Sequence, residues 1–281
     1  MAAAAGIVLA GGRSSRMGTS KAALEWHGST LLRRIVGLVA RGVDGPIVVV
    51  RAPGQQLPSL AQSVEIVEDA REGRGPLQGL AAGLSALSDR AEVAFVSSTD
   101  APLLHPAFVR RVVGALGDDV DVVLPRAGGF PHPLAAAYRT ALAPVVERLL
   151  AADRLRPAFL FDECRVLRLD EDALLADPAL AAADPALDSV LNLNEPADYE
   201  AARARPAPEI TVQRFGPLAR DGGGGPVALR AASLGAAATA AGVTLDEHVV
   251  AALNGDQISR DPHLPLVAGD TVAFMAADAG G

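Results

Sequence analysis

The residues most suited to chemistry lie at positions 9–21, LAGGRSSRMGTSK, directly after a short apolar run. The consecutive glycines Gly11 and Gly12 let the backbone come close to phosphate oxygens, so that its N–H groups can donate to them. Arg16 and Lys21 add positive charge, and a guanidinium can bind two phosphate oxygens at once. A loop of this composition at the end of a buried strand predicts a site for the phosphates of a nucleotide.

This loop is neither of the two common nucleotide-binding motifs. The sequence contains no G-x-x-x-x-G-K-[ST] and no G-x-G-x-x-G. An ordinary turn flanked by surface arginines is the alternative interpretation of Gly11 and Gly12. The strand before the loop and the three cations at Arg13, Arg16 and Lys21 favour phosphate binding instead.

A second candidate group is Asp100, which follows the apolar run at residues 93–97 and the polar residues 98–99. Ligands of open α/β sheets bind at the carboxyl ends of the strands. Mg²⁺ prefers hard oxygen ligands, often one or two carboxylates together with substrate phosphates. Asp100 is therefore a candidate magnesium ligand. Capping of the next helix is the alternative, but His105 and Pro106 lie nearer to that helix start.

A third group combines Asp69 with the turn at Gly75, Pro76 and Leu77. Proline needs no N–H in the first turn of a helix, and the glycine before it permits a tight entry. The free N–H groups at this helix start can face a base or a phosphate. An ordinary helix entry is the structural alternative.

Elements that could position these groups follow from the hydrophobic pattern. Short β-rich runs alternate with helical patterns up to about residue 205, which predicts an α/β fold with a mostly parallel sheet. Strands are expected at residues 6–9, 46–51, 64–67, 93–97, 121–125, 134–138, 164–169 and 190–193. Helices are expected at residues 30–43, 77–88, 107–116, 140–152 and 197–205.

The pattern changes after a Pro- and Ala-rich stretch at residues 203–208. We therefore expect two domains, at residues 1–205 and 209–281. In the second, strands are expected at residues 209–215, 226–230, 249–254 and 271–276, with a helix at 234–242. This β-β-α-β-β order predicts a small β-grasp domain. The glycines at residues 222–225 are expected to form a hairpin turn, with a flexible linker as the alternative.

Composition excludes several classes of function. The 281 residues carry a net charge of −8, which argues against non-specific nucleic-acid binding. No apolar run is long enough to span a bilayer, and the N-terminus lacks the basic region of a signal peptide. Cys164 is the only cysteine, so we expect a reducing cytoplasm and an incidental thiol. No cysteine or histidine cluster has zinc-ligand spacing.

The phosphate loop resembles the opening motif of nucleotidyltransferases, and most closely that of molybdenum cofactor guanylyltransferases. This resemblance covers roughly the first two thirds of the chain. It implies a Rossmann-like domain that uses Mg²⁺, with GTP and molybdopterin or the molybdenum cofactor as substrates. The matching positions of the loop are Leu9, Ala10, Gly11, Gly12, Arg16 and Lys21.

Later motifs carry the same resemblance. In the family, a G-P-L-x-G segment and the aspartate upstream of it face the guanine, and Gly75, Pro76, Leu77 and Asp69 match these positions. A D-x-P motif that carries the metal matches Asp100. Asn192 and Asn194 are similar to an asparagine pair that lies towards the second substrate or the metal. Helix capping is the alternative for Asn194.

The sequence departs from the family at several positions. Ser20 and Ala22 flank the loop lysine where relatives carry Asp and Gly. Arg51 replaces an asparagine, so it is a candidate for stacking on the purine or reaching a phosphate. The resemblance implies that Gly11, Gly12 and Arg16 hold the β- and γ-phosphates. It also implies that Lys21 neutralises charge at the α-phosphate and that Asp100 binds Mg²⁺.

The last residues, Ala279, Gly280 and Gly281, present no side chain that would block entry into a narrow active site. With residues 249–255 and 266–274 they resemble the small subunit of molybdopterin synthase and the sulfur carrier of the thiamine pathway. This second resemblance implies a thiocarboxylate at Gly281. It also implies the large subunit of molybdopterin synthase and an adenylylating enzyme as partners.

Two other functions remain open from the sequence. A cytidylyltransferase or sugar-1-phosphate nucleotidyltransferase would use the same chemistry on other substrates. A carrier protein with an inactive nucleotide domain belongs to a different class. Loss of Lys21 or Asp100 would favour that carrier, and the sequence retains both.

Overall fold

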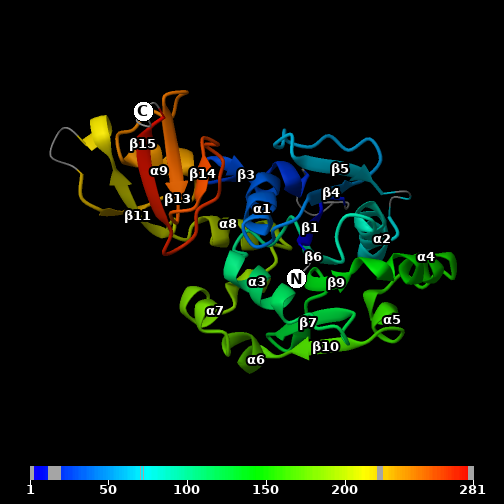
Figure 1. The fold of residues 1–281 in the computed structure, drawn as a ribbon. Helices are drawn as coiled ribbons and strands as arrows, with labels where there is room; N and C mark the ends of the chain where they lie inside the picture. Colours follow the sequence, from blue (N-terminus) through cyan, green and yellow to red (C-terminus); the bar gives the residue numbers. More distant parts are fainter. Residues whose placement is uncertain (1–2, 12–19, 70, 72, 220–223, 278–281) are drawn as a thin grey trace. The chain divides into compact units, whose positions relative to one another are not determined.

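The computed structural model describes residues 3–11, 20–69, 71, 73–219 and 224–277. By their internal contacts the residues form two compact units (Figure 1). The first comprises Met1–Leu24 and Leu31–Asp198, and the second comprises Glu25–Thr30 and Tyr199–Gly281. The short hairpin of β2 (Glu25–Trp26) and β3 (Ser29–Thr30), which the sequence pattern did not reveal, thus belongs to the second unit. The division into domains at residues 205–209 stays a prediction.

The first unit is built on a mostly parallel sheet, as predicted. Its strand order is β10-β7-β9-β6-β1-β4-β5, with β8 pairing on β7, and β9 is antiparallel to β6 and β7. The strands are β1 (Ala4–Leu9), β4 (Ile47–Arg51), β5 (Val64–Glu68), β6 (Val93–Ser98), β7 (Val122–Ala127), β8 (Phe130–Pro131), β9 (Ala135–Arg139) and β10 (Val166–Leu169).

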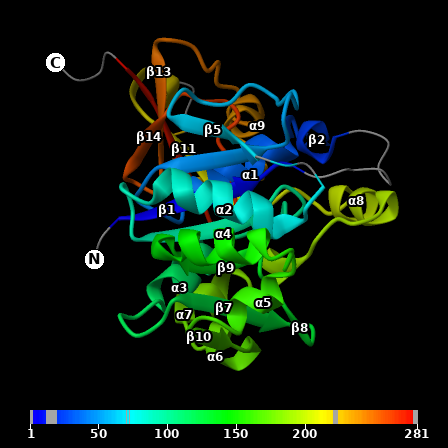
Figure 2. The same cartoon turned by 90° about the vertical axis from the view of Figure 1, so that its right-hand side faces the viewer.

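Helices cover both faces of this sheet. Residues of α2 and α4 form one core with the strands, and Figure 2 shows these two helices side by side on the near face. Helices α1 and α3 contact the sheet as well, with Phe108 of α3 edge-on to Phe95 of β6. The helices of this unit are α1 (Leu31–Ala40), α2 (Pro76–Leu87), α3 (Pro106–Gly114), α4 (Ala143–Ala151), α5 (Pro157–Phe161), α6 (Glu171–Leu175) and α7 (Pro178–Ala183). The division between the units falls within α8 (Pro196–Arg203). No helix among the described residues is long and apolar enough to cross a membrane.

Burial explains why β1 occupies the centre of the sheet. All six of its residues are buried, as expected for a parallel strand covered on both faces. It pairs with β4 on one side and β6 on the other, so that Leu9 lies opposite Val50 and Ser98. The loops that follow these three strands therefore begin at the same edge of the sheet.

The predicted strand at residues 190–193 is wrong. Asp188–Val190 is a 3₁₀ helix, and the following residues form no strand. The Leu193 backbone does not pair with a strand: its N–H donates to the Asp100 carbonyl oxygen, and its own carbonyl oxygen accepts from Lys21. The expected helix at 140–152 is divided into a 3₁₀ turn, Thr140–Leu142, and α4.

Three short helices, α5, α6 and α7, were not predicted because five or six residues are too few to show a helical period. A local signal was nevertheless present in two of them. Asp170 and Asp177 are N-caps whose carboxylates accept from the backbone N–H groups of the first turn.

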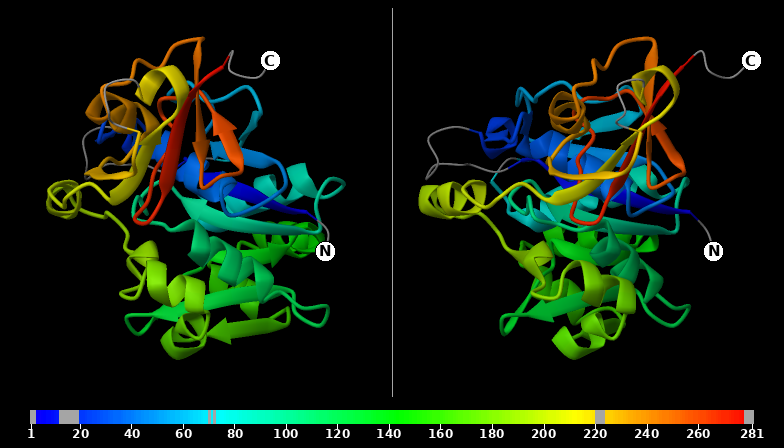
Figure 3. Two further views of the ribbon diagram at one scale, coloured as in Figure 1. Left: turned by 60° about the vertical axis from the view of Figure 1, so that its left-hand side comes forward. Right: turned by 90° about the vertical axis from the view of Figure 1, so that its left-hand side faces the viewer.

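The second unit contains a mixed sheet of strand order β12-β11-β15-β13-β14 (Figure 3). Strands β11 and β15 are parallel, and the remaining pairs are antiparallel. Helix α9 buries Leu234 and Ala237 against the sheet. The elements are β11 (Glu209–Arg214), β12 (Val227–Arg230), α9 (Leu234–Ala240), β13 (Val249–Leu253), β14 (Gln257–Ser259) and β15 (Thr271–Ala276).

One strand of this five-stranded sheet was missed. Strand β14 has three residues at the sheet edge, and its Ile258 is 61% exposed, so no alternation marked it. The predicted glycine turn falls partly on residues 220–223, which lie outside the described residues. Strands β11 and β12 on either side of it pair antiparallel, with Val212 opposite Val227.

The entry to α2 generates a stability prediction. Gly75 has a φ of +78° and is the N-cap before Pro76. A side chain is strained at this φ even where space is available, and here a Cβ would meet only the Leu155 carbonyl oxygen at 3.8 Å. We expect Gly75→Ala to lower the free energy of unfolding in urea by about 1–2 kcal/mol.

Gly114 provides the matched control. It ends α3 with open space around its Cα and without a positive φ. Gly114→Ala should leave the free energy of unfolding unchanged or raise it by about 0.4–1 kcal/mol. Equal effects of the two substitutions would contradict the strain argument.

Candidate functional site

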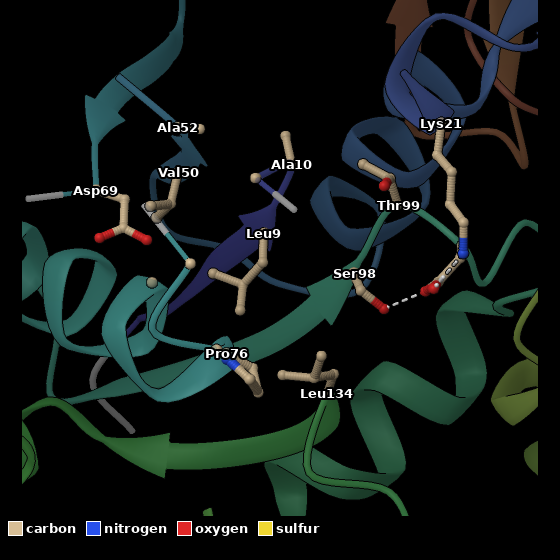
Figure 4. Close-up of a pocket in the computed structure, with 15 residues that line it drawn as sticks. Leu9, Ala10, Lys21, Val50, Ala52, Asp69, Pro76, Ser98, Thr99 and Leu134 are labelled. Atoms are coloured by element: carbon tan, nitrogen blue, oxygen red, sulfur yellow. Dashed lines mark hydrogen bonds and ion pairs between the residues drawn. The ribbon is translucent and has the colours of Figure 1, made fainter. Parts of the chain in front are cut away.

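A cavity of about 520 Å³ lies at the carboxyl ends of β1, β4 and β6 (Figure 4). Its wall includes the first residues after these strands and the start of α2. The lining residues are Leu9, Ala10, Gly11, Lys21, Val50, Ala52, Asp69, Gly73, Gly75, Pro76, Gly79, Ser98, Thr99, Asp100 and Leu134. Loops that meet at this edge of an open α/β sheet form its usual ligand site.

Lys21 and Asp100 meet at one end of the cavity. Lys21 Nζ donates to Asp100 Oδ2 at 3.2 Å and to the carbonyl oxygen of Leu193 at 2.6 Å. The Lys21 and Asp100 side chains are 18% and 20% exposed, so the ion pair is largely shielded yet open to the cavity. Lys21 is also the only lysine of the chain, beside 24 arginines.

Ser98 orients the Asp100 carboxylate. Its hydroxyl, at the end of β6, donates to Asp100 Oδ1 at 2.5 Å. The Leu193 N–H donates to the Asp100 carbonyl oxygen at 2.8 Å. Both oxygens of the carboxylate and its backbone are therefore held before any ligand arrives, which reduces the ordering cost on binding.

Asp69 lies at the opposite end of the cavity, with Leu9 and Ala10 between it and Lys21 in Figure 4. Its Oδ1 accepts from the Arg71 N–H at 3.1 Å. Burial raises the pKa of this carboxyl, and the hydrogen bond from Arg71 offsets part of the rise. The cavity therefore has a carboxylate at each end, but only Asp100 is paired with Lys21.

Gly11 lines the cavity where two backbone segments come close together. A Cβ on this residue would lie 3.2 Å from the backbone nitrogen of Ala52. Its own N–H donates to the Val50 carbonyl oxygen at 3.2 Å, which Ala10 also uses at 2.8 Å. The Gly11 N–H thus already has a partner in the protein, which argues against the predicted donation of this N–H to a phosphate.

Several predicted site residues do not reach the cavity. Arg51 forms an ion pair with Glu68 Oε1 at 2.9 Å and donates to the Gln55 carbonyl oxygen at 3.1 Å. It therefore points towards the neighbouring strand β5. Leu77 is fully buried in the core between α2 and the sheet. Its role is to hold the helix start in place.

Asn192 and Asn194 are exposed and do not line the cavity. The residue between them, Leu193, connects this segment to the site through its backbone. The alternative prediction, in which the Asn194 side chain caps the next helix, is not what the structure shows. The Asp198 carboxylate accepts instead from the backbone N–H groups of Asn194 and Glu195, at 3.1 and 2.9 Å. The predicted residues Gly12, Arg16 and Gly281 lie outside the described residues.

Sequence reasoning missed two kinds of lining residue. Ser98 and Thr99 stand directly before Asp100, so their position at the strand end was a usable signal. Leu134 and Gly73 come from segments that only the fold brings to the cavity, and no local pattern identified them.

The donor set at Asp100 fits a magnesium ion that shares its ligands with a substrate. Among the described residues, no group of three or more His, Cys, Asp or Glu side chains gathers as a metal site. One oriented carboxylate next to an open cavity is nevertheless the protein contribution typical of Mg²⁺ sites completed by phosphates and water.

The sequence model of the MobA-like NTP transferase domain matches residues 6–166, which is more than half of the chain. The chain belongs to this family. Its MobA-like domain contains the complete described cavity, and the second unit begins after the matched region apart from Glu25–Thr30. The protein therefore carries a nucleotidyltransferase domain.

Relatives named "Probable molybdenum cofactor guanylyltransferase" support this assignment. The one from Mycobacterium avium is 41% identical over 179 residues, which are 62% of this chain and 89% of that protein. The one from Mycobacterium ulcerans is 39% identical over 188 residues, covering 65% of this chain and 92% of that protein.

Solved structures share the fold. Molybdopterin-guanine dinucleotide biosynthesis protein A from Archaeoglobus fulgidus has a TM-score of 0.54 at 21% identity, covering 71% of this chain and 96% of that chain. A 2-C-methyl-D-erythritol 4-phosphate cytidylyltransferase from Thermus thermophilus has a TM-score of 0.50 at 17% identity. The match covers 70% of this chain and 96% of that chain. Because proteins named for different substrates share it, this fold does not select the nucleotide.

The environment of Asp69 generates a prediction for its titration. Since burial raises its pKa, Asp69 should protonate at a higher pH than an ordinary aspartate, whose pKa is about 3.9. The ionised carboxylate, which accepts hydrogen bonds, is then lost at a higher pH when the solution is acidified. NMR titration of the aspartate carboxyl carbons checks this expectation.

Asp121 is the internal contrast for the same titration. The hydrogen bond from Arg165 holds the pKa of Asp121 below the ordinary value, and Arg165→Gln should raise it. A pKa of Asp69 at or below that of Asp121 would show that burial does not dominate at the cavity.

Proposed function

We propose that the MobA-like domain transfers GMP from GTP to molybdopterin or the molybdenum cofactor and releases pyrophosphate. One observation carries the proposal: a single cavity holds the Lys21–Asp100 pair at one end and the separate carboxylate of Asp69 at the other. These ends suit the phosphates and the base of one nucleotide. The names of the mycobacterial relatives support the same activity.

Guanine is the base that a carboxylate recognises best. It presents N1–H and N2–H₂ donors on one edge, and both can donate to the two oxygens of Asp69. Cytosine offers no matching pair of donors. The nearby start of α2, with Gly75 and Pro76 exposed to the cavity, leaves room for a flat ring next to the backbone.

The phosphates would bind at the Lys21 end. Lys21 is held by the Leu193 carbonyl as well as by Asp100, so it stays directed into the cavity when Asp100 takes another partner. Its charge would be opposite the α-phosphate and the departing pyrophosphate. The cations and amides that hold the β- and γ-phosphates would come from the predicted loop residues Gly12 and Arg16.

Asp100 would hold Mg²⁺, with Ser98 fixing the direction of the carboxylate. When bound, the ion supplies neutralisation of the phosphate charge that grows during transfer. Lys21 donates to Asp100 Oδ2, so its ammonium lies beside the carboxylate that would hold the ion and could contact the same nucleotide.

The reaction requires positioning more than covalent help from the protein. An oxygen of the acceptor phosphate forms a bond to the α-phosphorus of GTP, and the bond from that phosphorus to the pyrophosphate oxygen breaks. The acceptor phosphate is already ionised, so no general base is needed. Lys21 then stabilises the negative charge on the leaving group.

The test is a nucleotide panel. The protein is incubated with Mg²⁺, molybdopterin and each nucleoside triphosphate in turn, and pyrophosphate and the dinucleotide product are measured. We expect product with GTP, and Asp69→Asn should raise the KM for GTP at least about tenfold because a charged hydrogen-bond acceptor is lost. Product with CTP or with a sugar 1-phosphate would instead establish one of the alternative transferases.

Lys21→Ala and Asp100→Ala should each lower kcat by at least about 100-fold, while circular dichroism shows that the fold survives. Lys21→Arg is the matched control for charge. It keeps the cation but replaces a compact ammonium with a planar fork, so partial recovery is expected. Near-full activity of either alanine variant would refute the corresponding role. Inactivity of the native protein with every nucleotide would favour the carrier alternative.

We further propose that the second predicted domain, residues 209–281, is a β-grasp domain related to sulfur carriers. Its strand order, with β11 and β15 parallel at the centre and α9 across one face, supports the β-grasp assignment. The carrier role rests on Gly280 and Gly281. The partners would be an adenylylating enzyme and the large subunit of molybdopterin synthase. We propose a cytoplasmic location for the protein on the same basis.

The carrier role is tested by intact mass spectrometry. The full chain is incubated with ATP, a sulfur donor and an adenylylating enzyme for sulfur carriers. Replacement of one carboxyl oxygen by sulfur raises the mass by about 16 Da, and Gly281→Ala should reduce this product because a methyl group obstructs the narrow entry. An unchanged mass in the native chain would remove the carrier role without affecting guanylyl transfer.

A further inference from the structure

The residues after β4 form a tight turn that a side chain closes. The Gln55 N–H donates to the Ala52 carbonyl oxygen at 3.0 Å, and Gln55 Oε1 accepts from the Ala52 N–H at 3.0 Å. Arg51 Nη1 donates to the Gln55 carbonyl oxygen at 3.1 Å. The Gln55 side chain is therefore held in one orientation by its own turn.

The nitrogen of the Gln55 amide reaches two residues near the ends of the phosphate loop, residues 9–21. It donates to the Ala10 carbonyl oxygen at 3.0 Å and, more weakly, to Ser20 Oγ at 3.5 Å. Ala10 directly precedes Gly11, and Ser20 directly precedes Lys21. One side chain thus joins both ends of the loop to the turn after β4.

The Ala10 carbonyl lies just beyond the paired part of β1. The last pair in the register of β1 and β4 is Leu9 with Val50. Ala10 is nevertheless only 6% exposed, and a buried carbonyl without a donor is costly. Gln55 supplies a donor at this point, so it extends the link between the two strands into their loops.

An amide side chain suits these contacts because one of its atoms accepts and the other donates. At position 55 the oxygen faces the Ala52 N–H and the nitrogen faces the Ala10 carbonyl. An ionised glutamate carries two acceptors and no donor. A glutamate at position 55 would therefore place an oxygen against the Ala10 carbonyl oxygen.

Gln55 acts from behind the cavity wall. Ala10, Gly11 and Ala52 line the cavity, whereas Gln55 is not among the described residues that do so. Ala10 and Ala52 follow neighbouring strands at this edge of the sheet (Figure 4). A Cβ on Gly11 would lie 3.2 Å from the Ala52 nitrogen, whose N–H donates to Gln55. Any effect of Gln55 on a ligand must therefore pass through the wall residues.

We propose that Gln55 is a positioning residue for the phosphates of the nucleotide. By holding Ala10 and Ser20 against one turn, it fixes where the loop begins and where Lys21 follows it. Groups that are held before a ligand arrives reduce the ordering cost of binding. This inference rests on the proposed function, in which the loop and Lys21 bind the phosphates and Asp69 binds the base. Loss of the Gln55 amide should weaken phosphate binding and leave base binding as it is.

The experiment compares a ligand that has the phosphates with one that lacks them. The Kd of GTP with Mg²⁺ is measured by isothermal titration calorimetry and the Kd of guanosine by NMR titration, without acceptor, so that no transfer takes place. Gln55→Ala and Gln55→Glu should raise the Kd of GTP about tenfold and leave the Kd of guanosine within about twofold of the native value. Gln56→Ala, at the exposed glutamine next in the chain, is the matched control and should change neither.

A double-substitution cycle tests the contact with Ser20. If Gln55 acts through Ser20, Ser20→Ala should raise the Kd of GTP about threefold in the native background and by less in the Gln55→Ala background. Equal effects in both backgrounds would overturn the link to the far end of the loop.

The outcomes separate the role of Gln55 from the proposed function. Native GTP affinity in Gln55→Ala overturns the positioning role and leaves guanylyl transfer intact. Equal weakening towards GTP and guanosine also overturns it, because a general loss of structure affects both ligands. A native protein that binds CTP instead of GTP contradicts guanylyl transfer, and the same comparison of CTP with cytidine then decides the role of Gln55.

Discussion

Lys21 joins three distant segments of the chain through two hydrogen bonds. Its ammonium contacts the Asp100 carboxylate, 79 residues away, and the Leu193 carbonyl, 172 residues away. A second bond, from the Leu193 N–H to the Asp100 backbone, closes the triangle. The cavity exists because these segments are held at one edge of the sheet. Strand β1 is buried between β4 and β6, and burial fixes its register with both neighbours. The segments that follow these strands therefore begin at the same edge of the sheet.

The two ends of the cavity differ in how the protein treats a carboxylate. Each oxygen of the Asp100 carboxylate accepts a hydrogen bond, Oδ2 from Lys21 and Oδ1 from Ser98. Among the residues that the structure describes, the Asp69 carboxylate accepts from one backbone donor, the Arg71 N–H, and burial raises its pKa. A partly desolvated acceptor of this kind gains most from a ligand that brings its own donors. The geometry thus gives two aspartates of one cavity different surroundings, and the different roles proposed for them rest on this difference.

The second unit depends on a different buried carboxylate. Asp270, 4% exposed, accepts from Val267 N–H and from the side chain of Asn254, and Asn254 in turn accepts from Thr271 N–H. These bonds tie the turn after β13, where Asn254 has a φ of +53°, to the start of β15. Strand β15 is thereby fixed between β11 and β13, at the centre of the sheet.

Local patterns were sufficient for much of the first unit. The alternation of apolar runs and helical periods predicted the α/β class and most strands of the sheet, because burial of a strand or helix face leaves a periodic trace in the sequence. The capping carboxylates of α6 and α7 were equally local, although their helices were too short to be recognised. The strand expected at residues 190–193 failed because its β-favouring residues found no neighbouring strand, and backbone pairing needs a partner.

The sequence by itself identified the candidate residues for chemistry: the lysine of the loop, the aspartate after the strand at residues 93–97 and the glycine–proline helix entry. Tertiary structure decided which of them meet. It directed Arg51 to Glu68, where an oppositely charged neighbour is in register, and it made the Leu193 backbone, rather than the asparagines beside it, the third member of the Lys21 contact. Charges and hydrogen-bond donors select partners by distance in space, and for residues far apart in the chain only the folded backbone sets that distance.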